Sequence, residues 1–343
     1  MSATIAHAVW QGIVILFGGA LLGMVYKGFD RKLAAQMQGR IGPPLRQPFY
    51  DVVKLMVKEN VVPDHAVGWL YNLMPLLSLA AVGTLLFYIP LGGFKPLLGG
   101  YGDLILILYL LAVPSLAMVV GGFAAGSPFA TVGAQREMVM MMAYEFPLAI
   151  TFLSIAWRLS VIPVDKLAGS GSIFSLSVIA SNPLWSFAGP EPWQLGAFGF
   201  IGLLLLFLSL FVVTPAELAK IPFDIPEAET EIAGGLLAEY SGRNLAMFYL
   251  GDAIKMVAMA SLMVAIFFPY GLANLFNVTG AWGGLIDVAF FLVKVFVVIF
   301  VAVITVRVGF ARLKVGQATR LFWLPVTGIS LLGMLLLTLD RFV

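Results

Sequence analysis

The feature that most constrains this chain is a series of eight apolar runs. Several reach about 20 residues, the length that a helix needs to cross ~30 Å of hydrocarbon. The chain is 61% hydrophobic and 11% charged, whereas soluble domains carry about 25% charged residues. It lacks the short alternating segments of a transmembrane β-barrel. We predict an all-α polytopic membrane protein with eight transmembrane helices, at about Ala8–Tyr26, Leu73–Pro90, Leu104–Phe123, Met138–Trp157, Gly196–Val213, Leu245–Phe268, Leu285–Val306 and Leu321–Leu339.

The basic residues are divided unequally between the loops that join these spans. Fourteen of the twenty lie in odd-numbered loops and four in even-numbered loops or ends, while Lys255 and Lys294 lie inside spans. Loops rich in Lys and Arg remain in the cytoplasm. We therefore predict a single membrane domain over residues 1–343, in the cytoplasmic (inner) membrane, with both termini extracytoplasmic. The cytoplasmic loops would be residues 27–72, 124–137, 214–244 and 307–320.

The first of these loops contains a pattern typical of an amphipathic helix. Gln47, Asp51, Lys54 and Lys58 occur at i, i+4, i+7 and i+11 and form one polar stripe, while apolar residues cover the rest. A helix divided in this way lies in the membrane interface. Pro48 suits its first turn, after a turn at Gly42-Pro43-Pro44. The alternative is an ordinary connector on the surface.

The segment Thr214–Arg243, called loop five below, holds six of the chain's eighteen acids. Pro222 and Pro226 bias the residues before them away from helix. We expect a helix to begin at Pro226, with Glu227 and Glu231 on one face. Crowded carboxylates titrate as a coupled set. The loop is thus either a proton-handling site or an acidic docking surface. Its acids are Glu217, Asp224, Glu227, Glu229, Glu231 and Glu239.

Glu145 lies inside the fourth expected span, and Glu137 lies at its expected cytoplasmic entrance. A charge at the bilayer centre costs at least ~2.5–3.5 kcal/mol, so it needs a partner, water or a function. No basic residue lies within one helical turn of Glu145. We expect Glu145 to exchange protons near neutral pH. The alternative is a carboxyl group that a neighbouring helix holds for packing.

Two acid–lysine pairs lie in the sixth and seventh expected spans. Asp252 and Lys255 are spaced i, i+3 and are expected to pair locally. Asp287 and Lys294 are seven residues apart, close to one helix face. Both pairs could simply neutralise charge. Alternatively, acids and lysines of adjacent spans could form a hydrated chain from loop five into the membrane.

The composition leaves little scope for a cofactor on the chain itself. There is no cysteine, and His7 and His65 lie far apart. Thiolate-held iron–sulfur clusters and thiolate zinc sites are therefore excluded within this chain. We expect no metal, no cofactor and no catalytic residue here, and as partners the lipid bilayer and other proteins but no nucleic acid.

Two long motifs resemble those of a known family. They are AELAKIPFDIPEAETEIAGGLLAEYSG in loop five and GRIGPPLRQPFYDVVKLMVKE in the first loop. They resemble the family of the H-type (mitochondrial subunit 1) membrane subunit of complex I. Within it, the resemblance is closest to the membrane subunit of energy-converting membrane-bound nickel–iron hydrogenases, of the hydrogenase-4 (component C) or formate hydrogenlyase type. RVGFARLKVGQATRLFW, before the last span, resembles a third family motif.

The resemblance implies a subunit that joins a hydrophilic redox arm to antiporter-like membrane subunits. The arm would contribute a catalytic large subunit and an iron–sulfur small subunit, with iron–sulfur clusters and a nickel–iron centre on those partners. The implied docking residues are Arg31, Arg40, Gly42, Pro43, Gln47, Pro48, Asp51, Lys54, Pro222, Phe223, Pro226 and Arg243. The implied proton-relay residues are the six acids of loop five and Glu145, to which position or burial adds Glu137 and Asp252.

The compact motif Gly42-Pro43-Pro44-Leu45-Arg46-Gln47-Pro48 favours one branch of this family. Quinone-reducing members typically have GPN and spaced glycines before LQP, and this chain does not. We therefore prefer a ferredoxin- or formate-linked, hydrogenase-type complex that couples redox energy to proton or ion translocation. The alternatives are the quinone-binding subunit of a respiratory NADH:quinone oxidoreductase and a sulfur-reducing relative. A stand-alone secondary transporter is disfavoured, because no internal repeat is evident.

Overall fold

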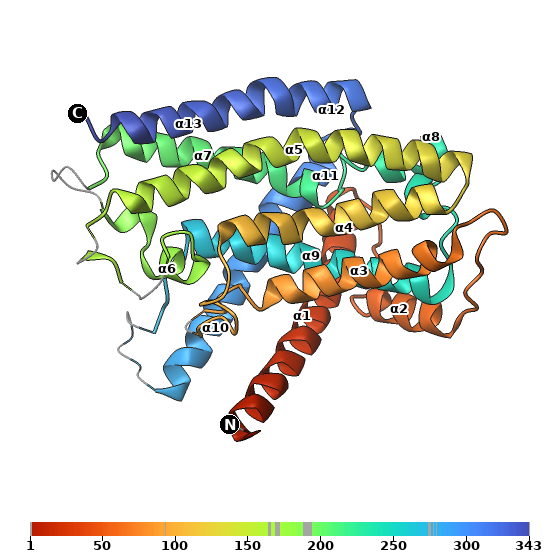
Figure 1. Cartoon of the computed structure of the whole chain (residues 1–343), viewed down its shortest axis with the longest axis horizontal. Helices are drawn as coiled ribbons and strands as arrows, with labels where there is room; N and C mark the ends of the chain where they lie inside the picture. Colours follow the sequence, from red (N-terminus) through yellow and green to blue (C-terminus); the bar gives the residue numbers. More distant parts are fainter. Residues whose placement is uncertain are drawn as a thin grey trace.

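The computed structural model is a bundle of long helices that run side by side (Figure 1). It describes residues 2–92, 94–163, 166–168, 172–187, 194–273, 276, 278 and 280–342, and these ranges contain no β-strand. Eight helical segments in them are long and apolar enough to cross a membrane, which confirms the predicted fold class. They comprise α1 (Ser2–Met37), α3 (Gly68–Leu86), α4 (Leu104–Ala124), α5 (Pro128–Ser160), α7 (Ala197–Glu217), α9 (Gly242–Phe267), α10 (Ala281–Val298) with its extensions η5 (Ile299–Thr305) and α11 (Val306–Gly309), and α12 (Val315–Leu321) with η6 (Phe322–Val326) and α13 (Thr327–Leu339).

Shorter helices lie in the connections. The amphipathic helix predicted for the first loop is present as α2, with Pro48 in its first turn. The short helices are α2 (Gln47–Val57), α6 (Leu176–Ser181), η2 (Leu184–Phe187), η3 (Ile225–Glu227), α8 (Glu229–Ile232) and η4 (Gly235–Leu237).

Most spans are longer than the apolar runs that predicted them, and α1 and α5 exceed the prediction most. α1 continues to Met37 and α5 begins at Pro128, so Glu137 lies inside a helix and not at its entrance. The prediction ended each span at its first charges. The helices continue because these charges have partners: Asp30 of α1, for example, accepts from Arg307 over 2.8 Å.

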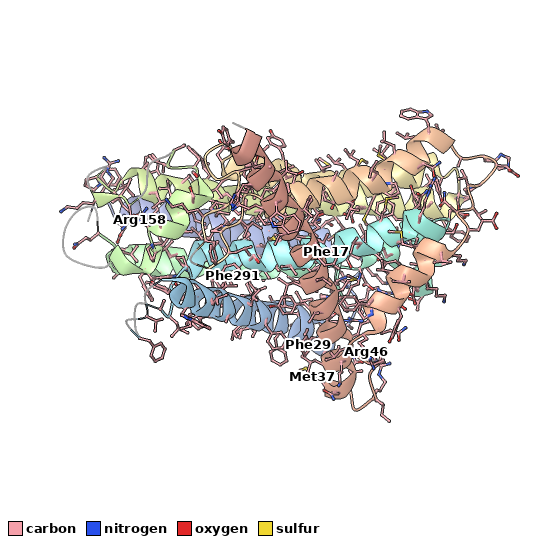
Figure 2. The ribbon with its side chains drawn as sticks, turned by 90° about the horizontal axis from the view of Figure 1, so that it is seen from below. Phe17, Phe29, Met37, Arg46, Arg158 and Phe291 are labelled. Atoms are coloured by element: carbon pink, nitrogen blue, oxygen red, sulfur yellow. The ribbon has the colours of Figure 1, made fainter. Side chains whose placement is uncertain are left out.

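α9 forms the centre of the bundle, and α1 lies at its edge. Every residue of α9 from Ala253 to Phe267 is buried, Lys255 included. A helix that is covered on all sides belongs to a core. α1 crosses the bundle obliquely (Figure 2) and exposes Trp10 and Phe17. Lys255 is therefore surrounded by protein and not by lipid.

Candidate functional site

Loop five folds into three single turns, η3, α8 and η4, and not into the predicted helix from Pro226. Ala228 is extended, with φ −61° and ψ 96°, and it separates η3 from α8. Ala233 and Gly234 then have positive φ values of 52° and 90° and end α8 after four residues. Glu227 and Glu231 consequently do not share a helix face. Contacts with Arg312 and Arg136, which lie outside the loop, determine this shape.

Arginines from outside the loop hold two of its acids. Arg312 donates to both carboxylate oxygens of Asp224, over 2.8 and 2.5 Å, and also to Thr230 over 2.8 Å. Its hydrogen bonds to Asp224 raise the pKa of Arg312. Arg136 of α5 lies 2.5 Å from Glu231. Such charge-assisted bonds are short and directional, so Asp224 and Glu231 fasten loop five to the bundle.

Asp252 of α9 lies between two lysines. Its carboxylate is 2.7 Å from Lys27 of α1 and 2.9 Å from Lys220 of loop five. Ala219, with φ 46°, reverses the chain at the end of α7 and brings Lys220 back toward α9. Burial disfavours the Lys220 ammonium, but the charge of Asp252 outweighs this effect and raises the pKa of Lys220. The predicted pair between Asp252 and Lys255 is therefore wrong, because Asp252 has partners from other segments.

Glu227 has no salt-bridge partner in the described part of the chain, although it lies close to these charges. Burial and the negative charge of Asp252 raise its pKa to about 7, and Lys220 opposes the shift. A carboxyl group with such a pKa exchanges its proton at neutral pH.

A second polar chain lies deeper in the bundle. Lys255 is 2.8 Å from Glu217 and donates to Ser115 over 3.3 Å. Ser115 lies 3.1 Å from the Tyr144 hydroxyl, which donates to Glu137 over 3.3 Å. All five side chains are buried. Glu137, Glu217 and Lys255 thus meet inside the membrane-spanning region.

Two hollows connect these groups. A cavity of about 60 Å³ borders Glu137, Glu217, Lys255, Lys220 and Asp252, which is room for about two water molecules at ~30 Å³ each. A charged hollow of about 290 Å³ opens beside loop five. The two share Ala219, Lys220, Glu227, Tyr249 and Asp252 as lining residues. A continuous polar region therefore leads from loop five to Glu137.

The other predicted relay acids lie at its margins. Glu145 is half-buried, and its Oε1 has no hydrogen-bond partner among the described residues. Glu229 is exposed and lines the charged hollow. Glu239 lines neither hollow; its backbone carbonyl accepts from Tyr71 over 2.7 Å.

The predicted docking residues fall into exposed and buried groups. Exposed Arg40 bonds to Gln38, and Lys54 and Arg243 are also exposed. Arg31 lies 2.6 Å from Asp51, which also accepts from Gln47 over 2.9 Å. Burial opposes ionisation of Asp51, but these hydrogen bonds prevail and lower its pKa. Gly42 and Pro43 are half-buried. The structure buries Pro48, Pro222, Phe223 and Pro226, so their side chains hold the fold and do not face a partner.

The expected pair between Asp287 and Lys294 is also absent. Lys294 donates to the backbone carbonyls of Phe268 and Tyr270 over 2.6 and 2.7 Å. Asp287 accepts from the backbone of Leu272 and Ala273 over 2.7 and 2.9 Å. Both charges therefore bind the segment that follows α9, far from the site.

The sequence indicated every acid of the site except Asp30, but it did not indicate most of the cations. The sequence alone suggested no role for Lys27 or Arg312, although Arg312 lies in RVGFARLKVGQATRLFW, the third motif that resembles the family. Ser115 and Tyr144 were missed because a single hydroxyl in an apolar span carries no sequence signal. Lys27 and Asp30 lie beside the predicted docking residue Arg31 at one end of α1, and their helical spacing could have revealed them.

Eight spanning helices around a buried polar site define a polytopic membrane subunit and not a simple membrane anchor. The particular family follows from comparison: the chain belongs to the NADH dehydrogenase family, whose model matches residues 10–338. The family expected from the motifs is thus confirmed.

Its relatives are subunits of oxidoreductase complexes. The H subunit of the NADH-quinone oxidoreductase of Geobacillus thermodenitrificans (strain NG80-2) is 30% identical, over 95% of this chain and 94% of the relative. Hydrogenase-4 component C of Escherichia coli (strain K12) is 34% identical, over 79% and 77%. A chain in the structure of the membrane-bound sulfane sulfur reductase, an archaeal respiratory membrane complex, has a TM-score of 0.80 at 28% identity, covering 96% of this chain and 99% of that chain.

Proposed function

We propose that this chain anchors and couples an energy-converting oxidoreductase complex in the cytoplasmic membrane. It would form one membrane domain that docks the redox arm and relays redox energy to proton or ion translocation. The observation that carries this proposal is the continuous polar region from loop five to Glu137. Burying ionisable groups in a membrane costs free energy, and packing alone does not require so many of them.

The proposed relay follows the order of the charges. Glu227 of loop five accepts or releases a proton at the charged hollow, and Asp252 with its lysines responds electrostatically. Glu217, Glu137 and Glu145 continue the path inside the bundle. Charges interact strongly in such an interior because the effective dielectric constant is low. A change of charge or position in the turns of loop five therefore changes the electrostatic potential at Glu217.

We assign the docking surface to the exposed parts of loops one and five. Arg40, Lys54 and Arg243 are exposed, and no salt bridge engages them in the described part of the chain. α2 also exposes apolar Val53 and Val57. The partners would be a catalytic large subunit and an iron–sulfur small subunit, which would carry the iron–sulfur clusters and a nickel–iron centre. Antiporter-like subunits would receive the relay within the membrane.

The charged hollow favours the hydrogenase-type branch. Ten of its thirteen lining residues are Asp, Glu, Lys or Arg, whereas a site for an apolar quinone would be lined mostly by apolar side chains. The quinone-reducing and sulfur-reducing alternatives share this fold. They are tested by assaying the purified complex for ferredoxin- or formate-dependent hydrogen evolution, for quinone reduction and for sulfur reduction.

The coupling role is tested in the complex reconstituted into vesicles. We expect Glu217→Gln to retain electron transfer but to lower the number of protons translocated per electron at least several-fold. Asp340→Asn, which changes an acid after the end of α13, outside both loops and both hollows, is the matched control and should leave that ratio unchanged. A wild-type ratio in Glu217→Gln would refute the proposal.

A further inference from the structure

Lys255 has carboxyl groups on two sides. Its ammonium lies 2.8 Å from Glu217, in direct contact. On the other side the hydroxyls of Ser115 and Tyr144 connect it to Glu137, through steps of 3.3, 3.1 and 3.3 Å. The five side chains come from α4, α5, α7 and α9, and each is at most 6% exposed. One cation is therefore shared by two carboxyl groups that belong to different helices.

Charge counting shows that this cluster holds one exchangeable proton. If Lys255, Glu217 and Glu137 were all ionised, the interior would carry one uncompensated negative charge, which costs several kcal/mol. A single proton shared by the two carboxyl groups removes that charge. Because an ammonium favours the ionised form of the carboxyl group that it touches, the proton belongs on Glu137 in this arrangement.

Lys255 also has space and partners for a second position. The cavity of about 60 Å³ borders Lys255, Glu217, Ser115 and Glu137 alike. Ser115 already accepts a hydrogen bond from the ammonium in the direction of Glu137. A lysine reaches a second partner readily, because its compact ammonium sits on a flexible four-carbon stem.

We propose that Lys255 is the moving part of the relay: its ammonium alternates between Glu217 and Glu137 and decides which of them carries the shared proton. Lys255 is thus a positioning residue, and this inference rests on the proposed function. Lys220 links the turns of loop five to this cluster. It lies three residues after Glu217, and it contacts Asp252, which is on the same helix as Lys255. A displacement of loop five therefore shifts Glu217 relative to Lys255.

The proton step balances without any further reactant. As the ammonium moves toward Glu137, the carboxyl O–H bond of Glu137 breaks and its proton passes to the Tyr144 hydroxyl. Tyr144 passes its own proton to Ser115. Ser115 passes one to Glu217 through water in the cavity that both residues border, and a new O–H bond forms on Glu217. Each hydroxyl releases one proton as it accepts another, and Lys255 stays protonated throughout.

The test uses the intact complex in vesicles and a variant that preserves packing. Tyr144→Phe removes one bridging hydroxyl but keeps the ring against Phe322. Tyr26→Phe is the matched control, since it removes another hydroxyl that bonds a backbone carbonyl over 3.0 Å. We expect Tyr144→Phe to slow proton translocation at least about tenfold, and Tyr26→Phe to leave it unchanged.

Infrared difference spectra of the complex during turnover provide a second readout. The wild type should lose one protonated-carboxyl band and gain another. Both bands should be absent from Glu137→Gln and from Glu217→Gln, because in each variant the remaining carboxylate alone neutralises Lys255. Lys255→Met combined with Glu217→Gln keeps the cluster free of an extra charge, and in it Glu137 should stay protonated throughout turnover.

Wild-type proton translocation in Glu137→Gln, or equal rates in Tyr144→Phe and Tyr26→Phe, would overturn the inference. If Glu217→Gln alone loses translocation, Lys255 is a fixed partner of Glu217 and the proposed function survives. If Glu217→Gln also translocates normally, the proposed function fails as well.

Discussion

The carboxyl groups of the site differ in whether a lysine or arginine side chain contacts them directly. Asp224 and Asp252 each touch one or two cations. Glu227 interacts with the same charges only at a distance and keeps a pKa of about 7. Acids that line one hollow therefore differ in whether a cation touches them.

Glu227 gives the site a specific pH dependence. Its pKa rises from 4.5 to about 7 on folding, through burial first and the charge of Asp252 second. Between these values the native protein binds more protons than the unfolded chain, so this group lowers stability as pH rises through that window. We expect the thermal midpoint of the complex to fall less between about pH 5 and about pH 8 in Glu227→Gln than in the wild type.

Coupled turnover should change in the same variant, because its pH profile should lose an ionisation near pH 7. Glu229→Gln is the matched control, since Glu229 is an exposed neighbour. Identical pH profiles and midpoints in Glu227→Gln and the wild type would show that Glu227 does not titrate in this range.

At this scale the sequence revealed the acids but not their partners. Carboxylates stand out in an apolar chain, so the predicted acids include all those of the site except Asp30. Their cations come from distant segments, and Asp30 and Arg307, for example, are 277 positions apart. Local spacing suggested that Asp252 pairs with Lys255, and both residues instead bind other elements.

At the scale of elements, apolar length predicts the helices but not where they end. α1 and α5 continue past their first charges because those charges are paired within the protein. Loop five differs more, because its own propensity favoured a helix from Pro226. Contacts with Arg312 and Arg136 override that propensity, and no pattern within the loop announces them.

The close contact between α5 and loop five provides a test at this scale. A Cβ on Gly133 would lie 2.6 Å from Leu236 N and 2.9 Å from Pro226 O. Gly133→Ala should therefore displace loop five and destabilise the protein by about 1–3 kcal/mol. We expect a lower thermal midpoint of the purified complex and faster proteolysis within loop five.

Gly328→Ala is the matched control, because Gly328 lies inside α13 with open space where its Cβ would be. Alanine favours a helix over glycine by up to about 1 kcal/mol, so this variant should be neutral or slightly stabilised. Equal behaviour of the two variants would mean that loop five does not rest on α5 as described.

At the scale of the whole molecule, the charged loops gather at one end of the bundle. Arg31 of α1 binds Asp51 of α2, and Val61 of loop one bonds Ser241 of loop five. Arg312, from the connection before the last span, closes the group by binding Asp224. The sequence predicted this gathering from the span count and the basic residues alone, because consecutive spans alternate in direction.

The unequal distribution of basic residues between the loops also predicts the orientation of the protein in the membrane. The absence of cysteine makes this prediction easy to test. A cysteine introduced at Lys58 or Arg341, both exposed, is the sole thiol in its variant. The positive-inside rule places Lys58 in the cytoplasm and Arg341 outside. A membrane-impermeant maleimide should therefore label Arg341→Cys in intact cells, and Lys58→Cys only in inside-out vesicles. The reverse pattern would place loop five outside the cell. No redox arm supplied with cytoplasmic electrons could then dock on it, so this labelling experiment tests the proposed assembly as well as the orientation.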